Sequence, residues 1–326
     1  MAPTDKDVGH DFLDMTLRDM RGVLHTTIHQ LTHARDFLDT SRMPCWTCTK
    51  VGSRQKKKFQ AQFRKAADKH PKRLIQKFGD LGTGDHVAMT DFHGRGGVQG
   101  DVHSSGPAYQ HPLRHTDVKK DDEQTLKAIN HIYGNDPRRR YYSDNRRALR
   151  NAAEMAGMQH ESCLPGIHQT NGIAESNNRS ILSGTRRLLM QAGLPACWWP
   201  YAAPCFCFLE SITLAEDQSC AYYERHGVHF PWRSIPCGQL VYYVPAPTKD
   251  NRGKAEPSMQ AGIFLGYRLA PGGRWEGDYL VADLNDFQGL PMHSKAELGL
   301  FKNVRPHTTR PVKRAQHGVH FPLFEH

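Results

Sequence analysis

Acidic side chains stand at three places in the sequence where predicted elements would present them to one another. The stretch 86–91 predicts a short buried strand that ends in Asp91, and the stretch 140–145 predicts a second strand with Asp144 at its end. Glu175 opens a predicted helix that extends to residue 191. Carboxylates gathered in this way form an oxygen-rich pocket that suits Mg²⁺, because the ion allows several carboxylates to stay ionised. Two such ions stabilise the attacking and the leaving oxygen of a phosphoryl transfer.

The helix that begins at Glu175 is predicted to carry a row of polar side chains. Glu175, Asn178 and Arg179 share one face, because residues three and four apart are neighbours on a helix. The preceding segment 165–172 has the composition of a loop. Such a row beside a glycine-containing loop is typical of a surface that faces a phosphate backbone. Spacing alone does not single out three acidic residues among the 33 Asp and Glu of the chain.

A second set of residues has the spacing of a zinc site. Cys45 and Cys48 are separated by two residues, which allows both thiolates to reach one tetrahedral ion. Upstream, His25, His29 and His33 recur every fourth residue and therefore share one face of a helix. His29 and His33 with the two cysteines would complete a His2Cys2 site. A pair of ordinary buried or free thiols is the alternative.

The positive charge of the chain is concentrated. Of the formal net charge of +10, the segment from Lys50 to Asp80 carries +9, since it contains eleven Lys and Arg against two Asp. Concentrated positive charge favours a polyanion, and nucleic acid is the commonest. A solvated basic helix, or a nuclear-import signal at Lys56, Lys57 and Lys58, is the alternative. A second cluster consists of Arg138, Arg139, Arg140, Arg146, Arg147 and Arg150.

The composition excludes several classes of protein. Apolar residues make up 38% of the 326 residues, and the mean hydropathy is −0.65, so a core is possible while much of the chain is solvated. Collagen, a coiled coil and wholesale disorder are excluded. The most apolar stretch, 196–209, contains Pro200 and Pro204 and is too short to span a bilayer. Neither a secretory signal nor a disulfide framework is expected.

Other elements must position the carboxylates. Residues 121–133 predict a helix with an acidic start, and residues 145–157 predict another. Between the first predicted strand and the first of these helices, residues 93–116 contain five glycines and two prolines without alternation of apolar side chains. This composition argues against two buried strands.

Several strings of the sequence resemble copia-type retrotransposon integrases. YSDN at 142–145 and PGIHQTNGIAESNNR at 165–179 look like the catalytic core of that family, and QAGLP at 191–195 continues the match. Downstream, GIFLGY at 262–267 and YLVAD at 279–283 look like its small SH3-like barrel. Upstream, the histidines and the CxxC pair look like its zinc-binding module.

The resemblance implies an α/β fold with a ribonuclease-H-like core, an N-terminal zinc-binding helical module and a small C-terminal SH3-like β-barrel. It implies a triad that binds two Mg²⁺ or Mn²⁺ ions, with Asn171 in a flexible active-site loop. Asn178 and Arg179 would face DNA. The implied triad consists of Asp91, Asp144 and Glu175.

The implied activity is the removal of nucleotides from a 3′ end of the element DNA, followed by direct attack of that end on target DNA without a covalent enzyme intermediate. The implied partners are element and target DNA and further copies of the chain, in the nucleus after a cytoplasmic particle stage. No membrane and no small-molecule substrate are expected. The chain corresponds to a fragment of a polyprotein.

Two other functions stay open. One is a catalytically degenerate nucleic-acid-binding relic of a transposon, which a ruined hairpin at 93–116 would favour. The other is a nuclease of the same fold that acts on RNA–DNA hybrids.

The matches also predict the domain boundaries. They are a tail at 1–24, the zinc module at 25–58, a basic linker at 59–84, the core at 85–215 with a degenerate hairpin at 93–116, the barrel at 235–290 and a tail at 291–326.

Overall fold

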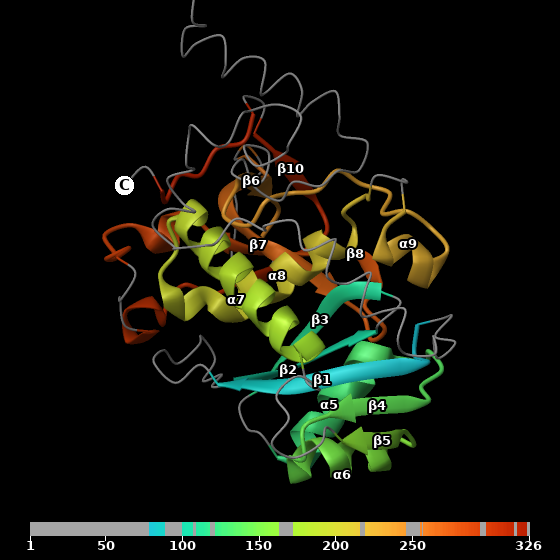
Figure 1. Cartoon of the computed structure of the whole chain (residues 1–326). Helices are drawn as coiled ribbons and strands as arrows, with labels where there is room; N and C mark the ends of the chain where they lie inside the picture. Colours follow the sequence, from blue (N-terminus) through green and yellow to red (C-terminus); the bar gives the residue numbers. More distant parts are fainter. Residues whose placement is uncertain are drawn as a thin grey trace, which may run out of the picture.

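The structure is a computed structural model of the 326-residue chain (Figure 1). It describes residues 78–88, 100–106, 109–117, 121–162, 172–215, 219–245, 255, 257–293, 298–315 and 318–324.

A five-stranded mixed sheet forms the first layer of the fold. The strand order is β3-β2-β1-β4-β5, with antiparallel pairing of β1 with β2 and β2 with β3 and parallel pairing of β1 with β4 and β4 with β5. This order and these directions are those of the ribonuclease-H-like α/β fold. The strands are β1 (Leu81–Ala88), β2 (Gly100–Gly106), β3 (Tyr109–Asp117), β4 (Arg140–Ser143) and β5 (Gln159–Ser162).

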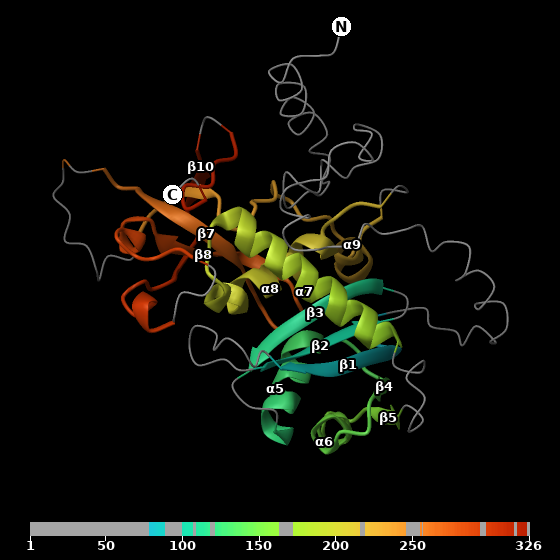
Figure 2. The ribbon, with the colours of Figure 1, turned by 60° about the vertical axis from the view of Figure 1, so that its left-hand side comes forward.

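Helices cover this sheet on both faces. Figures 1 and 2 show α5 (Asp122–Tyr133) and α6 (Arg147–Met155) on one side and the long α7 (Gly172–Ala192) on the other. The helices predicted at 121–133 and 145–157 are therefore present. Helix α5 begins where the Asp121 side chain accepts a hydrogen bond of 2.8 Å from the backbone N–H of Gln124, a side-chain N-cap.

The segment 93–116 differs from its expected degenerate form. β2 and β3 form an antiparallel hairpin that continues the pairing of β1, so this part of the sequence does supply two strands. Strand pairing depends on backbone hydrogen bonds, which a low content of apolar residues does not remove. Pro112 lies in β3, an edge strand of the sheet, where a residue without an N–H is tolerated.

A second sheet of five antiparallel strands follows. The strings at 262–267 and 279–283 lie in two neighbouring strands, with Gly262 opposite Asp283 and Tyr267 opposite Tyr279. The structure does not by itself identify this sheet as an SH3-like barrel, which stays a prediction. The order is β10-β6-β7-β8-β9, for β6 (Leu240–Tyr243), β7 (Gln260–Leu269), β8 (Trp275–Asp283), β9 (His307–Thr309) and β10 (Val312–Arg314).

The segment predicted as a C-terminal tail contributes to this second sheet. β9 pairs with β8 and β10 pairs with β6, so both strands lie beyond the expected boundary at residue 290. Phe301 and Val304 are fully buried before β9. The polar composition concealed these short strands, because only a few apolar side chains in this region reach the core.

Helix α8 (Trp199–Ser211) lies between the two sheets, next to a strand of each. Its backbone approaches β3 on one side and β7 on the other. One hydrophobic cluster includes Trp198, Phe206 and Phe208 from the helical side and Phe264 from β7. The apolar stretch 196–209 is thus a core element, and none of the helices in the described part of the chain could span a membrane. The shorter helices are η2 (Ala196–Trp198), α9 (Ala221–His226), η3 (Asn285–Phe287) and η4 (Leu298–Phe301).

The contact between α7 and α8 depends on a glycine. A Cβ atom added at Gly184 would lie 2.2 Å from Cε2 of Phe206, a buried ring. We expect Gly184→Ala to lower the free energy of unfolding by about 1–3 kcal/mol, because overpacking outweighs the better helix propensity of alanine. Gly299→Ala in η4 is the control, since a Cβ there meets nothing within 4 Å. Chemical denaturation of both variants measures the difference, and equal stability of Gly184→Ala and the natural protein would contradict this packing.

Candidate active site

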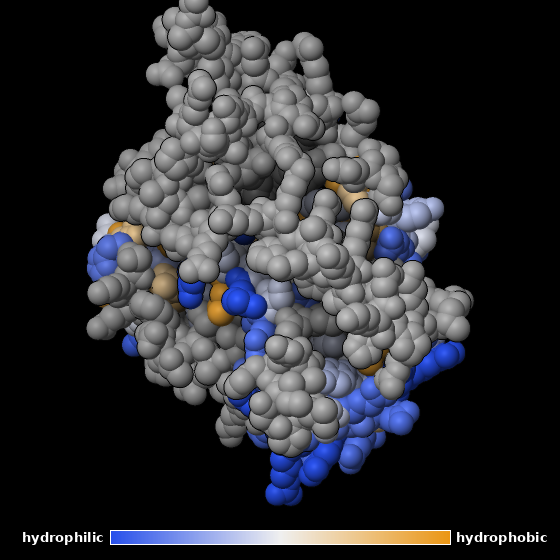
Figure 3. Space-filling model, in the orientation of Figure 1, coloured by the Kyte–Doolittle hydropathy of each residue, from blue (hydrophilic) through white to orange (hydrophobic). Residues whose placement is uncertain are grey.

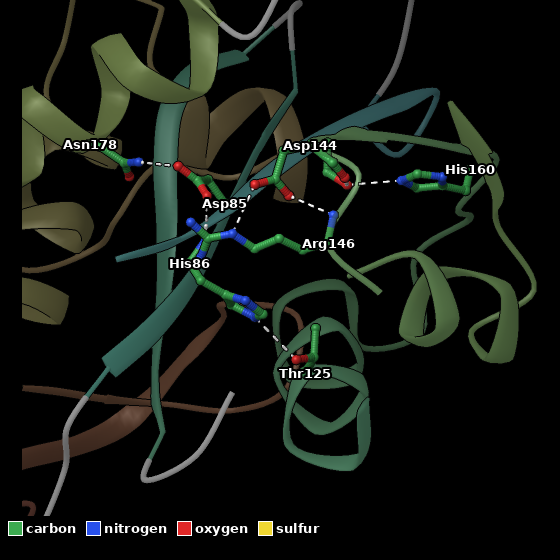
Figure 4. Close-up of polar contacts among 8 residues, drawn as sticks. Asp85, His86, Thr125, Asp144, Arg146, His160 and Asn178 are labelled. Atoms are coloured by element: carbon green, nitrogen blue, oxygen red, sulfur yellow. Dashed lines mark hydrogen bonds and ion pairs between the residues drawn. The ribbon is translucent and has the colours of Figure 1, made fainter. Parts of the chain in front are cut away.

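The register of two parallel strands brings two carboxylates to one place. β1 pairs with β4 so that Gly84 lies opposite Ser143, and the next residues along the two strands are Asp85 and Asp144. Figure 4 shows both carboxylates pointing to the same space at the end of β4. Asp144 was predicted from the sequence, whereas Asp85 was not.

Two hydrogen bonds and two charged side chains set the environment of Asp85. Asn178 of α7 donates a hydrogen bond of 2.9 Å from Nδ2 to Asp85 Oδ2, and the backbone N–H of His86 donates one of 2.7 Å to Oδ1. Burial, followed by the negative charge of Asp144, raises the pKa of Asp85, although Arg146 and the two hydrogen bonds oppose this rise. The site therefore disfavours two negative charges unless a cation compensates for them.

Asp144 is held by the residue two positions later. The Nε atom of Arg146 lies 2.9 Å from Asp144 Oδ2, and the backbone N–H of Arg146 donates a hydrogen bond of 3.2 Å to Oδ1. The Asp144 side chain is 26% exposed and that of Arg146 is 50% exposed. The ion pair is therefore accessible to water and to other ions.

Neighbouring polar contacts fix the two strands that carry the aspartates. His86, buried on β1, has its Nε2 atom 3.1 Å from Thr125 Oγ1 on α5. Ser143, the residue before Asp144, is fully buried, and its Oγ atom lies 2.9 Å from Nε2 of His160 on β5. Figure 4 shows the His160 imidazole in this contact. Burial lowers the pKa of His160, which favours the neutral ring in this contact. Buried pairs of this kind limit the movement of the carboxylates.

Helix α7 places Glu175 and Arg179 near this edge of the sheet. Asn178, one turn after Glu175, contacts Asp85, so the same end of the helix lies over β1. Glu175 and Arg179 are exposed. Within the described ranges, no three His, Cys, Asp or Glu side chains lie close enough to hold one metal ion together. The structure thus brings together Asp85, Asp144 and Asn178, with Glu175 on the helix that contacts them.

The other predicted site residues lie outside the part of the chain that the structure describes, and their roles stay predictions. They are Asp91, the loop residue Asn171, the basic residues Lys56, Lys57 and Lys58, and the zinc candidates His29, His33, Cys45 and Cys48.

Sequence reasoning missed Asp85 because glycine and threonine surround it. β1 begins at Leu81, five residues before the strand that the apolar pattern predicts. The stretch LGTGD has no run of apolar residues, although Gly82, Thr83 and Gly84 are buried in the sheet. Small residues fill a central strand without leaving a hydrophobic signal.

The arginine cluster at 138–150 divides into two groups. Arg138, Arg139 and Arg140 lie at the start of β4, where Arg140 is 3.6 Å from Glu161. The other group follows Asp144, at the first turns of α6. Figure 3 shows hydrophilic residues over the part of this face where β4, β5 and α6 lie. The arginines of the second group are Arg146, Arg147 and Arg150, and all three are exposed.

The side chains at this edge suit a divalent cation. The carboxylates of Asp85 and Asp144 lie together, and the pKa of Asp85 is raised. The carboxamide of Asn178 orients the Asp85 carboxylate through a hydrogen bond. Mg²⁺ prefers carboxylate oxygens and usually retains several waters, so two protein carboxylates and a partly open side are compatible with it. The donor set therefore fits Mg²⁺ or Mn²⁺.

The chain is similar to a curated protein over a third of its length. A segment of 115 residues is 30% identical to the "Retrovirus-related Pol polyprotein from transposon TNT 1-94" of Nicotiana tabacum, and it covers 34% of this chain and 8% of that polyprotein. No family model matches the sequence.

Two solved structures are similar to larger parts of the chain. One is the cryoEM structure of the simian T-cell lymphotropic virus intasome in complex with PP2A regulatory subunit B56 gamma. It has 13% sequence identity and a TM-score of 0.40, and the match covers 76% of this chain and 81% of that one. The other is the crystal structure of the catalytic core domain of BIV integrase. It has 11% sequence identity and a TM-score of 0.35, and the match covers 44% of this chain and 91% of that one.

Proposed function

We propose that this chain, an integrase-like retrotransposon protein, processes the 3′ ends of element DNA and joins them to target DNA with Mg²⁺ or Mn²⁺. The observation that carries the proposal is the pair formed by Asp85 and Asp144 on neighbouring parallel strands. A bound divalent ion supplies activation of the attacking water or hydroxyl and neutralises charge on the phosphate. Asp85 and Asp144 would hold that ion, and Asn178 would keep the Asp85 carboxylate oriented.

Glu175 is proposed as the third carboxylate. It lies one turn before Asn178, on the end of α7 that contacts β1. Its side chain is exposed, and it would add a third carboxylate to those that hold the ion. Two aspartates compete for the first position of the triad, namely Asp91, which the resemblance implies, and Asp85, which lies beside Asp144. We propose Asp85.

DNA contact is proposed for the basic residues near the carboxylates. Arg147 and Arg150 on α6 and Arg179 on α7 are exposed at the two helices that flank the site. Phosphate contacts of this kind position a duplex without reading its sequence. Asn171 and the run Lys56–Lys58 are proposed to extend this surface.

Other properties implied by the resemblance remain proposals. They are a zinc ion bound by His29, His33, Cys45 and Cys48, assembly of several copies on paired DNA ends, and nuclear localisation.

The non-catalytic alternative loses its main support. A ruined hairpin favoured a relic, because the first carboxylate strand would have no neighbour, whereas β2 does pair with β1. An RNA–DNA nuclease would use the same carboxylates, and only the substrate would differ.

A strand-transfer assay tests the proposal. The full chain, a labelled DNA duplex with an element end and Mg²⁺ or Mn²⁺ are expected to yield joined products. Asp144→Asn and Glu175→Gln are expected to lower the rate more than a hundredfold, because each removes a charged ligand of the ion. Glu276→Gln is the matched control, since Glu276 is an exposed residue of β8 in the second sheet. Equal activity in all four proteins, including none, would contradict an enzyme, and cleavage of RNA–DNA hybrids alone would establish the nuclease.

A further inference from the structure

Arg146 occupies the position where a cation would compensate for the aspartate pair. Its Nε atom is 2.9 Å from Asp144 Oδ2, and its charge also acts on Asp85, whose ionised form it favours. Figure 4 shows the Arg146 side chain paired with Asp144, with its guanidinium on the side toward Asp85. One side chain of the chain itself thus supplies a positive charge to both acidic residues.

The location of Arg146 in the backbone is otherwise unfavourable for a cation. Arg146 is the N-cap residue of α6 and makes no side-chain capping hydrogen bond. The N-terminus of a helix carries a partial positive charge, and Ser, Thr, Asp or Asn are preferred there. The two carboxylates account for an arginine at this position better than the helix does.

The ion pair is also weak enough to be displaced. The Arg146 side chain is half exposed, and exposed ion pairs contribute only about 0–1 kcal/mol. A divalent ion brings twice the charge of a guanidinium to the same oxygens. Arg146 can leave Asp144 without unfolding α6, because its backbone N–H donates to Oδ1 independently of the side chain.

We propose that Arg146 is a displaceable internal counter-ion, which balances the Asp85–Asp144 pair in the metal-free protein and must swing away before a divalent cation binds there. This inference rests on the proposed function, because it takes the aspartate pair as the metal site. Arg146 is therefore a positioning residue that sets the metal affinity of the site.

Direct measurement of Mn²⁺ binding tests the inference without any activity assay. Titration calorimetry of the full chain with Mn²⁺ is expected to show binding about three- to fivefold tighter in Arg146→Gln than in the natural protein, since the competing charge is removed. Arg147→Gln is the matched control, because it removes one positive charge from the next residue, an exposed position on α6. Arg147→Gln is expected to change the affinity less than twofold.

Two further variants separate the possible outcomes. Arg146→Lys keeps the charge and is expected to stay within about twofold of the natural affinity. Arg146→Gln combined with Asp144→Asn is expected to lose the gain, because the oxygen for which arginine and metal compete is gone. Equal tightening by Arg146→Gln and Arg147→Gln would overturn the counter-ion role and leave the proposed metal site standing. No Mn²⁺ binding in any single-arginine variant or the natural protein would overturn both.

Discussion

Asp85→Asn is expected to lower the strand-transfer rate more than a hundredfold, whereas Asp91→Asn is expected to leave it within about threefold of the natural value. Asparagine has the shape of aspartate but lacks the charge that holds a divalent ion. Among the residues that the structure describes, Asp85 lies beside Asp144 through the register of β1 and β4. The reverse order of the two variants would show that Asp91 is the first carboxylate, as the family resemblance implies.

Unfolding measurements separate this loss of activity from a loss of structure. Burial and Asp144 raise the pKa of Asp85, so the native state favours the protonated carboxyl relative to the unfolded chain. The resulting stabilisation is present below the unfolded pKa and disappears as the pH rises through the raised native pKa. At pH 7 the charged carboxylate therefore costs stability in the metal-free protein. Asp85→Asn should accordingly unfold at the same temperature as the natural protein or at a higher one at this pH.

Arg225→Ala is expected to lower the free energy of unfolding by about 2–4 kcal/mol. Arg225 of α9 pairs with Asp136 through Nε at 2.8 Å and Nη2 at 2.7 Å, and Nη2 also donates to the carbonyl of Ile132 at 2.7 Å. Its guanidinium carbon lies 3.8 Å from the ring centroid of Phe78. Because the Arg225 side chain is only 6% exposed, its removal takes away a buried group and leaves the carbonyl of Ile132 without this donor.

Another Arg–Asp pair provides the control for this prediction. Arg310 Nε lies 2.9 Å from Asp278 Oδ1, but the Arg310 side chain is 75% exposed. Arg310→Ala is expected to cost about 0–1 kcal/mol, because water replaces the lost contact. Urea denaturation of both variants gives the comparison. Equal effects would mean that burial does not determine the contribution of the Arg225 pair.

The helices at 121–133, 145–157 and 175–191 and one carboxylate strand could be predicted because their signals are local. Asp121 caps α5 through its side chain, and Ile129 and Ile132 of that helix are buried as the helical period requires. Asp144 follows a short strand whose Tyr141 is fully buried. These features depend on neighbouring residues, so a single sequence reveals them.

The elements that were missed depend on contacts between distant parts of the chain. Asp85 becomes a site residue only through its pairing with β4 and through Asn178, which is 93 positions away. β9 and β10 are three residues each, and β8 and β6 define them as strands. The hairpin of β2 and β3 is held by the ladder that begins at β1, not by an apolar pattern of its own. The local composition of the sequence does not reveal which strands pair or in which register.

The contacts of helix α8 bear on where the chain can be divided into domains. Its backbone lies next to β3 on one side and β7 on the other, and Phe208 shares a cluster with Tyr267 of β7, at a ring separation of 4.5 Å. A domain boundary between residues 215 and 235 would therefore divide one hydrophobic cluster. A fragment that ends there would expose Phe206, Phe208 and their neighbours to solvent. The C-terminal third of the described chain is not an appendage, because its strands share one hydrophobic cluster with α7 and α8.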